Sequence, residues 1–452
     1  MSKTAGENKM GVMPVKKLIV TMSLPMMFSM LVQALYNIVD SIFVSRIDEG
    51  ALTAVTLAFP LQSLIIAVGS GTGVGINALL SKALGEKNFE RSDKAANTGI
   101  LLTLFSYIVF LAVGIFVSDP FINSQTSDPQ IAAYGSTYLR IVCILSIGAM
   151  SQMTMERLLQ STGKTFYSML SQITGAVINM VFDPIMIFGL FGFPKLGVAG
   201  AAYATIFGQA VASLLAFYLN VKHNTEITLS LKSVFTPDIN IIKRIYFVGV
   251  PSILMMSIGS VMTYSMNMIL TAFSSTATAV FGVYFKLQSF FFMPVFGLNN
   301  GLIPVMAYNY GAKNKERIHE ALRFSIGLAV GIMIAGTVVF QLIPGTLLGF
   351  FNASEHMKEL GIPALRIISL HFPIAGCAIA LGSVFQAFSK PVYSLIISVC
   401  RQIVVLIPAA WLLSLTGLVT NVWWSFLIAE VVSLTLSVIF YKKVNRDIIS
   451  KL

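Results

Sequence analysis

Two stretches of this chain follow one pattern: residues 61–91 read LQSLIIAVGSGTGVGINALLSKALGEKNFER, and residues 287–317 read LQSFFFMPVFGLNNGLIPVMAYNYGAKNKER. Sliding the first stretch forward by 226 positions superimposes the leading LQS, and it places Gly71, Gly75 and Gly85 on Gly297, Gly301 and Gly311. It also places KNFER on KNKER, without a gap. The same offset places Pro25 on Pro251, and it still holds far downstream, where Lys164 falls on Lys390. Two half-chains therefore share one plan, which in a strongly apolar chain predicts a transporter with two lobes.

The composition excludes a soluble globular protein. Of 452 residues, 56% are hydrophobic and only 11% are charged, whereas a soluble domain carries about 25% charged residues. About twelve apolar stretches are long enough to cross a hydrocarbon core about 30 Å thick. In the first half we expect them near 18–44, 52–80, 95–116, 134–158, 167–191 and 198–219, and in the second half near 246–273, 278–308, 322–342, 364–388, 392–413 and 421–441.

Spans that are apolar throughout favour helices over the alternating strands of a membrane barrel. The predicted fold is an all-α integral membrane protein with twelve transmembrane helices in two six-helix lobes. We expect an N-lobe over residues 1–222, a polar cytoplasmic linker over 223–240 and a C-lobe over 241–452. The three cysteines, Cys143, Cys377 and Cys400, lie inside apolar spans without metal-ligand spacing, so we interpret them as packing residues.

The net charge of +11 has a distribution that indicates membrane orientation rather than nucleic-acid binding. Most Lys and Arg residues fall on the side of the N-terminus, the central linker and the tail, and the opposite side keeps only Arg46, Lys195 and Lys358. The positive-inside rule then predicts a multi-pass protein of the cell membrane, inner or plasma, with both termini in the cytoplasm. An even number of spans per lobe gives the lobes the same orientation, related by a pseudo-two-fold axis along the membrane normal.

Ionisable residues inside spans are costly and point to function. In the first lobe these are Asp40, Arg140 and Asp183, and helix geometry places them with Thr205 in one layer of the outer half. Asn179 lies one helical turn before Asp183, so both side chains share a face. Carboxylate, amide and hydroxyl oxygens suit Na+, and two nearby carboxylates also suit a shared proton. The alternative is a structural salt bridge between Asp40 and Arg140.

The second lobe carries the opposite balance of buried charge. Lys286, Arg366 and Arg401 stand against one acid, Glu430, in the predicted spans. Anionic or zwitterionic cargo is one interpretation. The other is that Glu430 pairs with Lys286 or Arg401 and locks helices together. Aromatic and methionine residues in both lobes favour a broad apolar pocket for amphipathic compounds.

The ordered set of motifs resembles the multidrug and toxic compound extrusion (MATE) family over essentially the whole chain. The motifs are the stretch QALYNIVD at 33–40, GTG at 71–73, YLRI at 138–141, Asn179 with Asp183-Pro184, and GVAGAA at 197–202. The Asp-Pro pair is similar to the DinF-like branch of bacteria and archaea. Some relatives carry an acidic site on spans seven and ten, whereas this span seven has no acid and span ten has Arg366 and His371.

The resemblance implies two helix bundles that rock between outward-open and inward-open states and export organic cations by antiport of Na+ or H+. Carried over residue by residue, a coupling-ion site, for Na+ or a proton, falls on Asp40, Asn179, Asp183 and Thr205, with Tyr138, Tyr36 and Asn37 nearby. For the substrate cleft we consider Gln33, Met30, Lys286, Gln288, Phe292, His371, Arg401 and Glu430.

Several other expectations complete this interpretation. We expect no cofactor beyond the coupling ion, a monomer, small-molecule and lipid partners, and no nucleic acid. The alternative within the transporter class is a flippase or exporter of lipid-linked oligosaccharides or anionic metabolites. An enzyme is disfavoured, because the spans show no paired histidines, no Ser/His arrangement and no cluster of metal ligands.

Overall fold

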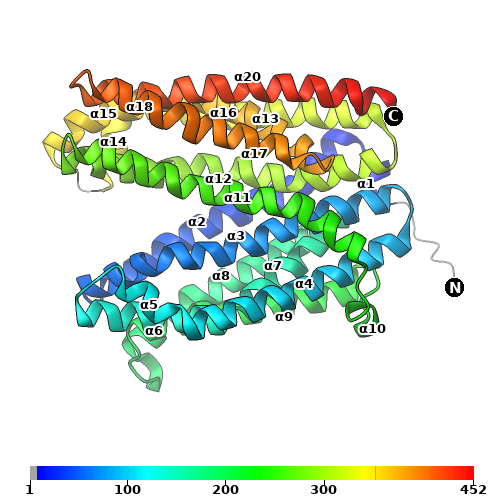
Figure 1. Cartoon of the computed structure of the whole chain (residues 1–452), viewed down its shortest axis with the longest axis horizontal. Coiled ribbons are helices and arrows are strands. Elements are labelled where there is room, and N and C mark those ends of the chain that lie inside the picture. The colour runs from blue at the N-terminus through cyan, green and yellow to red at the C-terminus, as the bar shows by residue number, and fades with distance from the viewer. Residues whose placement is uncertain (1–7, 352) are drawn as a thin grey trace. The chain divides into compact units, whose positions relative to one another are not determined.

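The structure, a computed structural model, describes residues 8–351 and 353–452, and the regular secondary structure in these ranges is helical. Figure 1 shows the helices in chain order. Within these ranges, ten helices are long and apolar enough to cross a membrane, or twelve if each of two bent helix pairs is one span. The prediction of an all-α membrane protein is therefore confirmed.

The chain forms two compact units. Unit 1 comprises Met1–Lys9 and Phe28–Ile253, and unit 2 comprises Met10–Met27 and Leu254–Leu452. The helices that lie wholly in unit 1 are α3 (Glu49–Gly85), α4 (Phe89–Phe116), α5 (Ser118–Asn123), α6 (Pro129–Ile144), α7 (Ile147–Ser161), α8 (Thr165–Phe188), η1 (Leu190–Gly192), α9 (Val198–His223) and α10 (Leu231–Val234).

Unit 2 repeats this order. After the short α1 (Lys9–Val12), its own helices are α12 (Ser275–Gly311), α13 (Lys315–Leu342), α14 (Pro344–Gly349), α15 (Glu355–Ser369), α16 (Phe372–Ala387), α17 (Pro391–Val399), the π-helical η2 (Cys400–Leu406), α18 (Ile407–Ser414), α19 (Val419–Val422), α20 (Trp424–Asp447) and η3 (Ile449–Lys451). Helix α16 lies between α13 and α20, with which it packs (Figure 1).

Two long helices belong to both units. Helix α2 (Val15–Ser45) starts in unit 2 and enters unit 1 after Met27, and α11 (Ile239–Thr271) starts in unit 1 and enters unit 2 after Ile253. The two crossing points are equivalent at the offset of 226, and each follows a proline inside the helix, Pro25 or Pro251. The units therefore differ from the boundaries expected from sequence, 1–222 and 241–452, because one continuous apolar span can pack its two halves in different bundles.

Repeated glycines allow these crossing helices to pack closely. A Cβ atom on Gly75 of α3 would lie 2.2 Å from the Ile245 carbonyl oxygen of α11. In unit 2, a Cβ on the equivalent Gly301 of α12 would lie 2.7 Å from the Cα of Ser23 on α2. Only a residue without a side chain permits such backbone contact. The glycine pairs seen in the sequence are thus the positions where each bundle receives the swapped half-helix.

The helix N-termini repeat as well. Asp48 caps α3 by accepting a hydrogen bond from the backbone N–H of Ala51, and the equivalent Ser274 caps α12 in the same way. Asn88 and Asn314 cap α4 and α13, while Asp128 and Ser354 cap α6 and α15. Each cap satisfies backbone donors that a helix start would otherwise leave unpaired. Local signals therefore set the same helix starts in both units.

Two predicted spans are bent rather than straight. The span expected at 134–158 divides into α6 and α7, which meet at 46°, and the span expected at 364–388 divides into α15 and α16, which meet at 44°. The two bends occupy corresponding places in the two units. His371 lies directly at the second bend, as the residue before α16.

Candidate ion site and polar clusters

The coupling-ion candidates lie on four helices of unit 1. Asp40 is on α2, Tyr138 on α6, Asn179 and Asp183 on α8, and Thr205 on α9. Helix α8 presents a stripe of small and polar residues to the interior of the unit, and Asn179 and Asp183 are part of it. Asn179, Asp183, Thr205 and Tyr138 are each at most 3% exposed. The structure thus buries these side chains in the bundle instead of turning them towards lipid.

The contacts within this layer leave acidic oxygens without partners. The Asn179 amide donates to the Thr205 hydroxyl at 3.1 Å, and the Tyr138 hydroxyl donates to Gln62 at 3.4 Å. Neither carboxylate oxygen of Asp183 has a hydrogen-bond donor among the described residues, and Oδ1 of Asp40 is also buried without one. Buried polar atoms without partners are rare in folded proteins.

The two carboxyl groups are neighbours. Asp40 and Asp183 lie close enough to interact directly, and they can share a hydrogen bond once one of them is protonated. The hydroxyl of Tyr36 interacts with Thr205 and with both acids, and Tyr138 lies within electrostatic reach of the same two carboxylates.

Asn37 is the exception among the seven candidates. Its side chain is exposed, and no hydrogen bond joins it to this group in the described residues. The structure therefore brings six of the seven candidates together. It does not place Asn37 in the layer, although that residue neighbours Tyr36 in sequence.

Pro184 follows Asp183 inside α8, and the helix continues through it to Phe188. A proline has no backbone N–H, so the carbonyl of Met180 lacks its usual helical donor. This is one more backbone oxygen on the turn that carries Asp183. In residues 8–351 and 353–452 no group of three or more His, Cys, Asp or Glu side chains is arranged to hold a metal ion. The layer instead combines two carboxylates with hydroxyl and amide oxygens, a set suited to Na+ or a proton.

Arg140 takes no part in this layer, contrary to the expectation from helix depth. Its side chain is half exposed and forms an ion pair with Asp119 of α5. The alternative of a structural salt bridge between Asp40 and Arg140 is therefore wrong. The short helix α5 packs against α6 and supplies the acid, a contact that span counting does not reveal.

Unit 1 contains a further buried carboxylate, outside the ion site. Glu156 of α7 is 4% exposed and accepts hydrogen bonds from Gln152, Gln172 and Ser171, at 2.9, 2.8 and 3.0 Å. The next residue, Arg157, is 9% exposed. Glu156 and Arg157 lie at the end of a predicted span, but their burial shows that they are not a solvated helix end. The sequence signal was the polar stripe of residues 152, 156 and 160 at helical spacing, which faces the interior.

In unit 2 the buried acid has a partner. Glu430 of α20 is 3% exposed and its carboxylate pairs with the guanidinium of Arg401 at 3.1 Å. Arg401 lies in the π-helical η2, and its side chain is 32% exposed. Lys286 is exposed, with its ammonium 6.0 Å from the ring of Phe351, so it is not the partner. Of the two expected partners for Glu430, the structure selects Arg401.

His371 and Tyr284 lie within electrostatic reach of this ion pair. His371 contacts the rings of Phe292 and Phe426, with centroids 6.0 and 5.9 Å apart, and the charges of Glu430 and Arg401 act on it. The Tyr284 hydroxyl nearby is buried without a hydrogen-bond partner among the described residues.

The substrate-cleft candidates are distributed over both units. Phe292, His371, Arg401 and Glu430 cluster in unit 2, as described above. Among the described residues, no hydrogen bond or ion pair joins Lys286 or Gln288 to that cluster. Gln33 and Met30 belong to unit 1, on the part of α2 beyond its crossing point.

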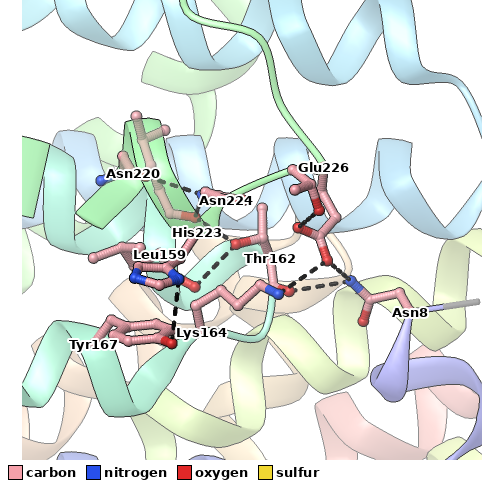
Figure 2. Close-up of polar contacts among 11 residues, drawn as sticks. Asn8, Leu159, Thr162, Lys164, Tyr167, Asn220, His223, Asn224 and Glu226 are labelled. Carbon is pink, nitrogen blue, oxygen red and sulfur yellow. Dashed lines mark hydrogen bonds and ion pairs between the residues drawn. The ribbon is translucent and has the colours of Figure 1, made fainter. Parts of the chain in front are cut away.

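A further polar cluster of unit 1 joins Asn8, Thr162, Lys164 and Glu226 (Figure 2). The Asn8 amide donates to the Thr162 carbonyl at 3.1 Å and to Glu226 at 3.2 Å, and Glu226 lies 3.6 Å from the ammonium of Lys164. Beside Asn8, burial lowers the pKa of Lys9, the charge of Lys164 lowers it further, and Glu226 partly opposes both. Asn8 is therefore held by the loop after α7 and by the linker after α9.

The two-unit helical fold with a buried pair of carboxylates defines a two-lobed membrane transporter. The model of the MatE family matches the chain twice, over residues 25–185 and 251–412, which together make up more than half of it. The chain therefore belongs to the MATE family and is a transporter, not an enzyme. The two matches begin at Pro25 and Pro251, the equivalent prolines of the internal repeat.

Individual relatives align along nearly the whole chain. The multidrug export protein MepA of Staphylococcus haemolyticus is 27% identical over 95% of this chain and 94% of its own. An outward-facing multidrug resistance MATE family transporter of the MOP superfamily has a TM-score of 0.93 with 27% identity and covers 100% of both chains. A MOP superfamily transporter from Pyrococcus furiosus Vc1, whose binding pocket is described as reversed in polarity, has a TM-score of 0.88, 27% identity and coverage of 96% and 97%.

Proposed function

We propose that this transporter exports amphipathic, mostly cationic organic compounds in exchange for Na+ or H+, and that the coupling ion binds between Asp40 and Asp183. The staphylococcal multidrug export proteins support the export of drug-like compounds, since they align along almost the full chain. The main support for the ion site is the environment of the Asp183 carboxylate. It is fully buried, lacks any hydrogen-bond donor among the described residues and neighbours a second carboxylate.

An ionised carboxylate in such a place is costly. Burial without a partner costs several kcal/mol, and two negative charges about 4 Å apart repel by about 4 kcal/mol at an effective dielectric constant of 20. A proton or Na+ removes both costs. The Asn179–Thr205 pair supplies further oxygens, and the Met180 carbonyl, which lacks its usual helical donor, lies on the turn that carries Asp183.

Transport follows if the ion binds one state of the protein better than the other, because only a difference in affinity shifts a conformational equilibrium. Substrate enters the inward-open state, the lobes rock, and an ion from outside at Asp40 and Asp183 favours release. In this proposal the protein works as a monomer in the cell membrane, with both termini in the cytoplasm and no cofactor.

A flippase or exporter of lipid-linked oligosaccharides or anionic metabolites is the second candidate. The similarity to the Pyrococcus furiosus transporter with a pocket of reversed polarity favours it. The pairing of Arg401 with Glu430 weighs against it, because this neutralises the buried cation that would hold a phosphate. Cationic cargo is therefore the better-supported proposal.

The test uses protein reconstituted in liposomes, with a Na+ gradient or a pH gradient imposed separately and the efflux of a cationic and an anionic dye followed. We expect the cationic dye to move under one of the gradients and Asp183→Asn to abolish that movement. Asp119→Asn is the matched control, since it removes a partly buried carboxylate of the same unit that pairs with Arg140 outside the ion site. Undiminished efflux by Asp183→Asn would overturn the coupling site, and preferential efflux of the anionic dye would favour the second candidate.

A further inference from the structure

Unit 2 carries an open groove of about 760 Å3 where α2 and α13 begin. Its lining changes character along α13: charged or titratable residues occupy the first turns, and apolar residues follow. The lining residues are Lys16, Glu316, His319, Glu320, Arg323, Phe324, Gly327 and Leu328. Charged groups followed by an apolar strip along a membrane-spanning helix match the headgroup and acyl chain of a lipid.

The internal repeat shows that this face of the helix is a docking face. At the offset of 226, His319 and Arg323 of α13 correspond to Asp93 and Asn97 of α4. In unit 1, the Asp93 carboxylate accepts from the backbone N–H of Thr228 at 2.6 Å. The Asn97 amide donates to the Thr228 carbonyl at 2.8 Å. The linker segment around α10 therefore lies on α4 and covers the face that α13 leaves open.

No described segment takes that place in unit 2. A Cβ atom built on Gly327 would meet nothing within 4 Å, so the apolar floor of the groove is open. His319 lies against α20, where its Nδ1 is 3.3 Å from the Tyr441 hydroxyl. The linker covers this face of α4 in unit 1, whereas the equivalent face of α13 in unit 2 is open. The open face is therefore available to an amphipathic molecule.

The charges that line the groove are balanced, with two positive and two negative side chains. Lys16 and Arg323 supply two positive charges, and Glu316 and Glu320 supply two negative charges. None of the four forms an ion pair with another described residue. At the equivalent positions of unit 1, by contrast, Glu90 and Lys94 pair with each other at 2.8 Å. The groove thus offers separate partners for a positive and a negative group.

We propose that this groove binds a phospholipid with a zwitterionic headgroup that ends in a primary ammonium, as in phosphatidylethanolamine. Arg323 and Lys16 donate to the phosphodiester, whose oxygens accept charge-assisted hydrogen bonds. Glu316 and Glu320 accept from the ammonium, which carries three donors. The acyl chain lies along Phe324, Gly327 and Leu328. A choline headgroup has no N–H to donate, and a glycerol headgroup leaves both glutamates without a cation.

The experiment is native mass spectrometry of the full-length, delipidated protein with equal amounts of phosphatidylethanolamine, phosphatidylcholine and phosphatidylglycerol that carry the same acyl chains. We expect phosphatidylethanolamine to bind about tenfold more tightly than phosphatidylcholine, as loss of charge-assisted hydrogen bonds implies. The double variant Glu316→Gln/Glu320→Gln should remove that preference and raise phosphatidylglycerol binding. Arg323→Gln should weaken both phosphatidylethanolamine and phosphatidylglycerol.

Glu90→Gln is the matched control, since it changes the repeat-equivalent acid of unit 1 and should leave all three lipids unaffected. Equal binding of phosphatidylethanolamine and phosphatidylcholine by the wild-type protein would overturn the proposal. So would a preference for phosphatidylglycerol, or a loss in Glu90→Gln as large as that in the double variant. Because the substituted side chains are exposed, each variant should elute as the wild type does from a sizing column.

Discussion

The ion pair between Arg401 and Glu430 makes an asymmetric prediction for stability. The Glu430 side chain is 4% exposed and that of Arg401 is 32% exposed, at 3.1 Å separation. Arg401→Met leaves a buried carboxylate alone and should cost about 3 kcal/mol, the lower end of the range for a broken buried pair. Glu430→Gln leaves a guanidinium that still reaches polar surroundings, and should cost about 1 kcal/mol. Removing both charges, in Arg401→Met/Glu430→Leu, should come close to the wild type.

Thermal unfolding of the detergent-purified variants measures this order, at about 2–4 °C per kcal/mol for a bundle of this size. The reasoning would be refuted if Glu430→Gln lowered the melting temperature as much as Arg401→Met does. It would also be refuted if the double variant lowered the melting temperature by the sum of the two single effects. Dye efflux by the double variant separates two roles for the pair. Retained transport indicates a lock between helices, whereas a loss with normal stability indicates a part in substrate recognition.

Two further perturbations test the packing and the N-terminal anchor. Gly75→Ala should lower the free energy of unfolding by about 3 kcal/mol or more, because the new Cβ would lie 2.2 Å from the Ile245 carbonyl; Gly282→Ala, in open space, should be neutral in the same thermal assay. Lys9→Met should raise the melting temperature at pH 7. The native pKa of Lys9 lies below 10.5, so the native state binds its proton less tightly than the unfolded state does. The destabilisation caused by burying charged Lys9 is full below its native pKa and vanishes as the pH approaches 10.5. A difference in melting temperature between wild type and Lys9→Met that persists at that pH would contradict the burial argument.

The sequence predicted the architecture because the signals for it are local and repeated. The length of a span indicates one helix, and the glycines at 71 and 75 indicate where that helix packs closely against a neighbour. The offset of 226 then shows that the second half repeats these signals. The same is true of Asn179 and Asp183, whose shared face follows from helix geometry alone. Helix caps such as Asp48 and Ser274 likewise act within one turn.

The rest depended on contacts between distant segments. The partner of Arg140 is Asp119, on a short helix outside the predicted spans, so depth alone misplaced the arginine. Glu156 can be buried because glutamine and serine side chains on two helices donate hydrogen bonds to it. A search of the sequence for charged partners does not find these neutral donors. The exchange of half-helices after Met27 and Ile253 is invisible in hydropathy, because both halves of each span are equally apolar.

The central claim is that Asp40 and Asp183 bind the coupling ion, and ion binding to the purified protein tests it most directly. We predict that the wild type either takes up radioactive Na+ in competition with protons or, if the proton is the coupling ion, releases protons when a cationic substrate is added. Asp183→Asn should lose this response, and Asp119→Asn should keep it. An equal response from wild type and Asp183→Asn would contradict the account.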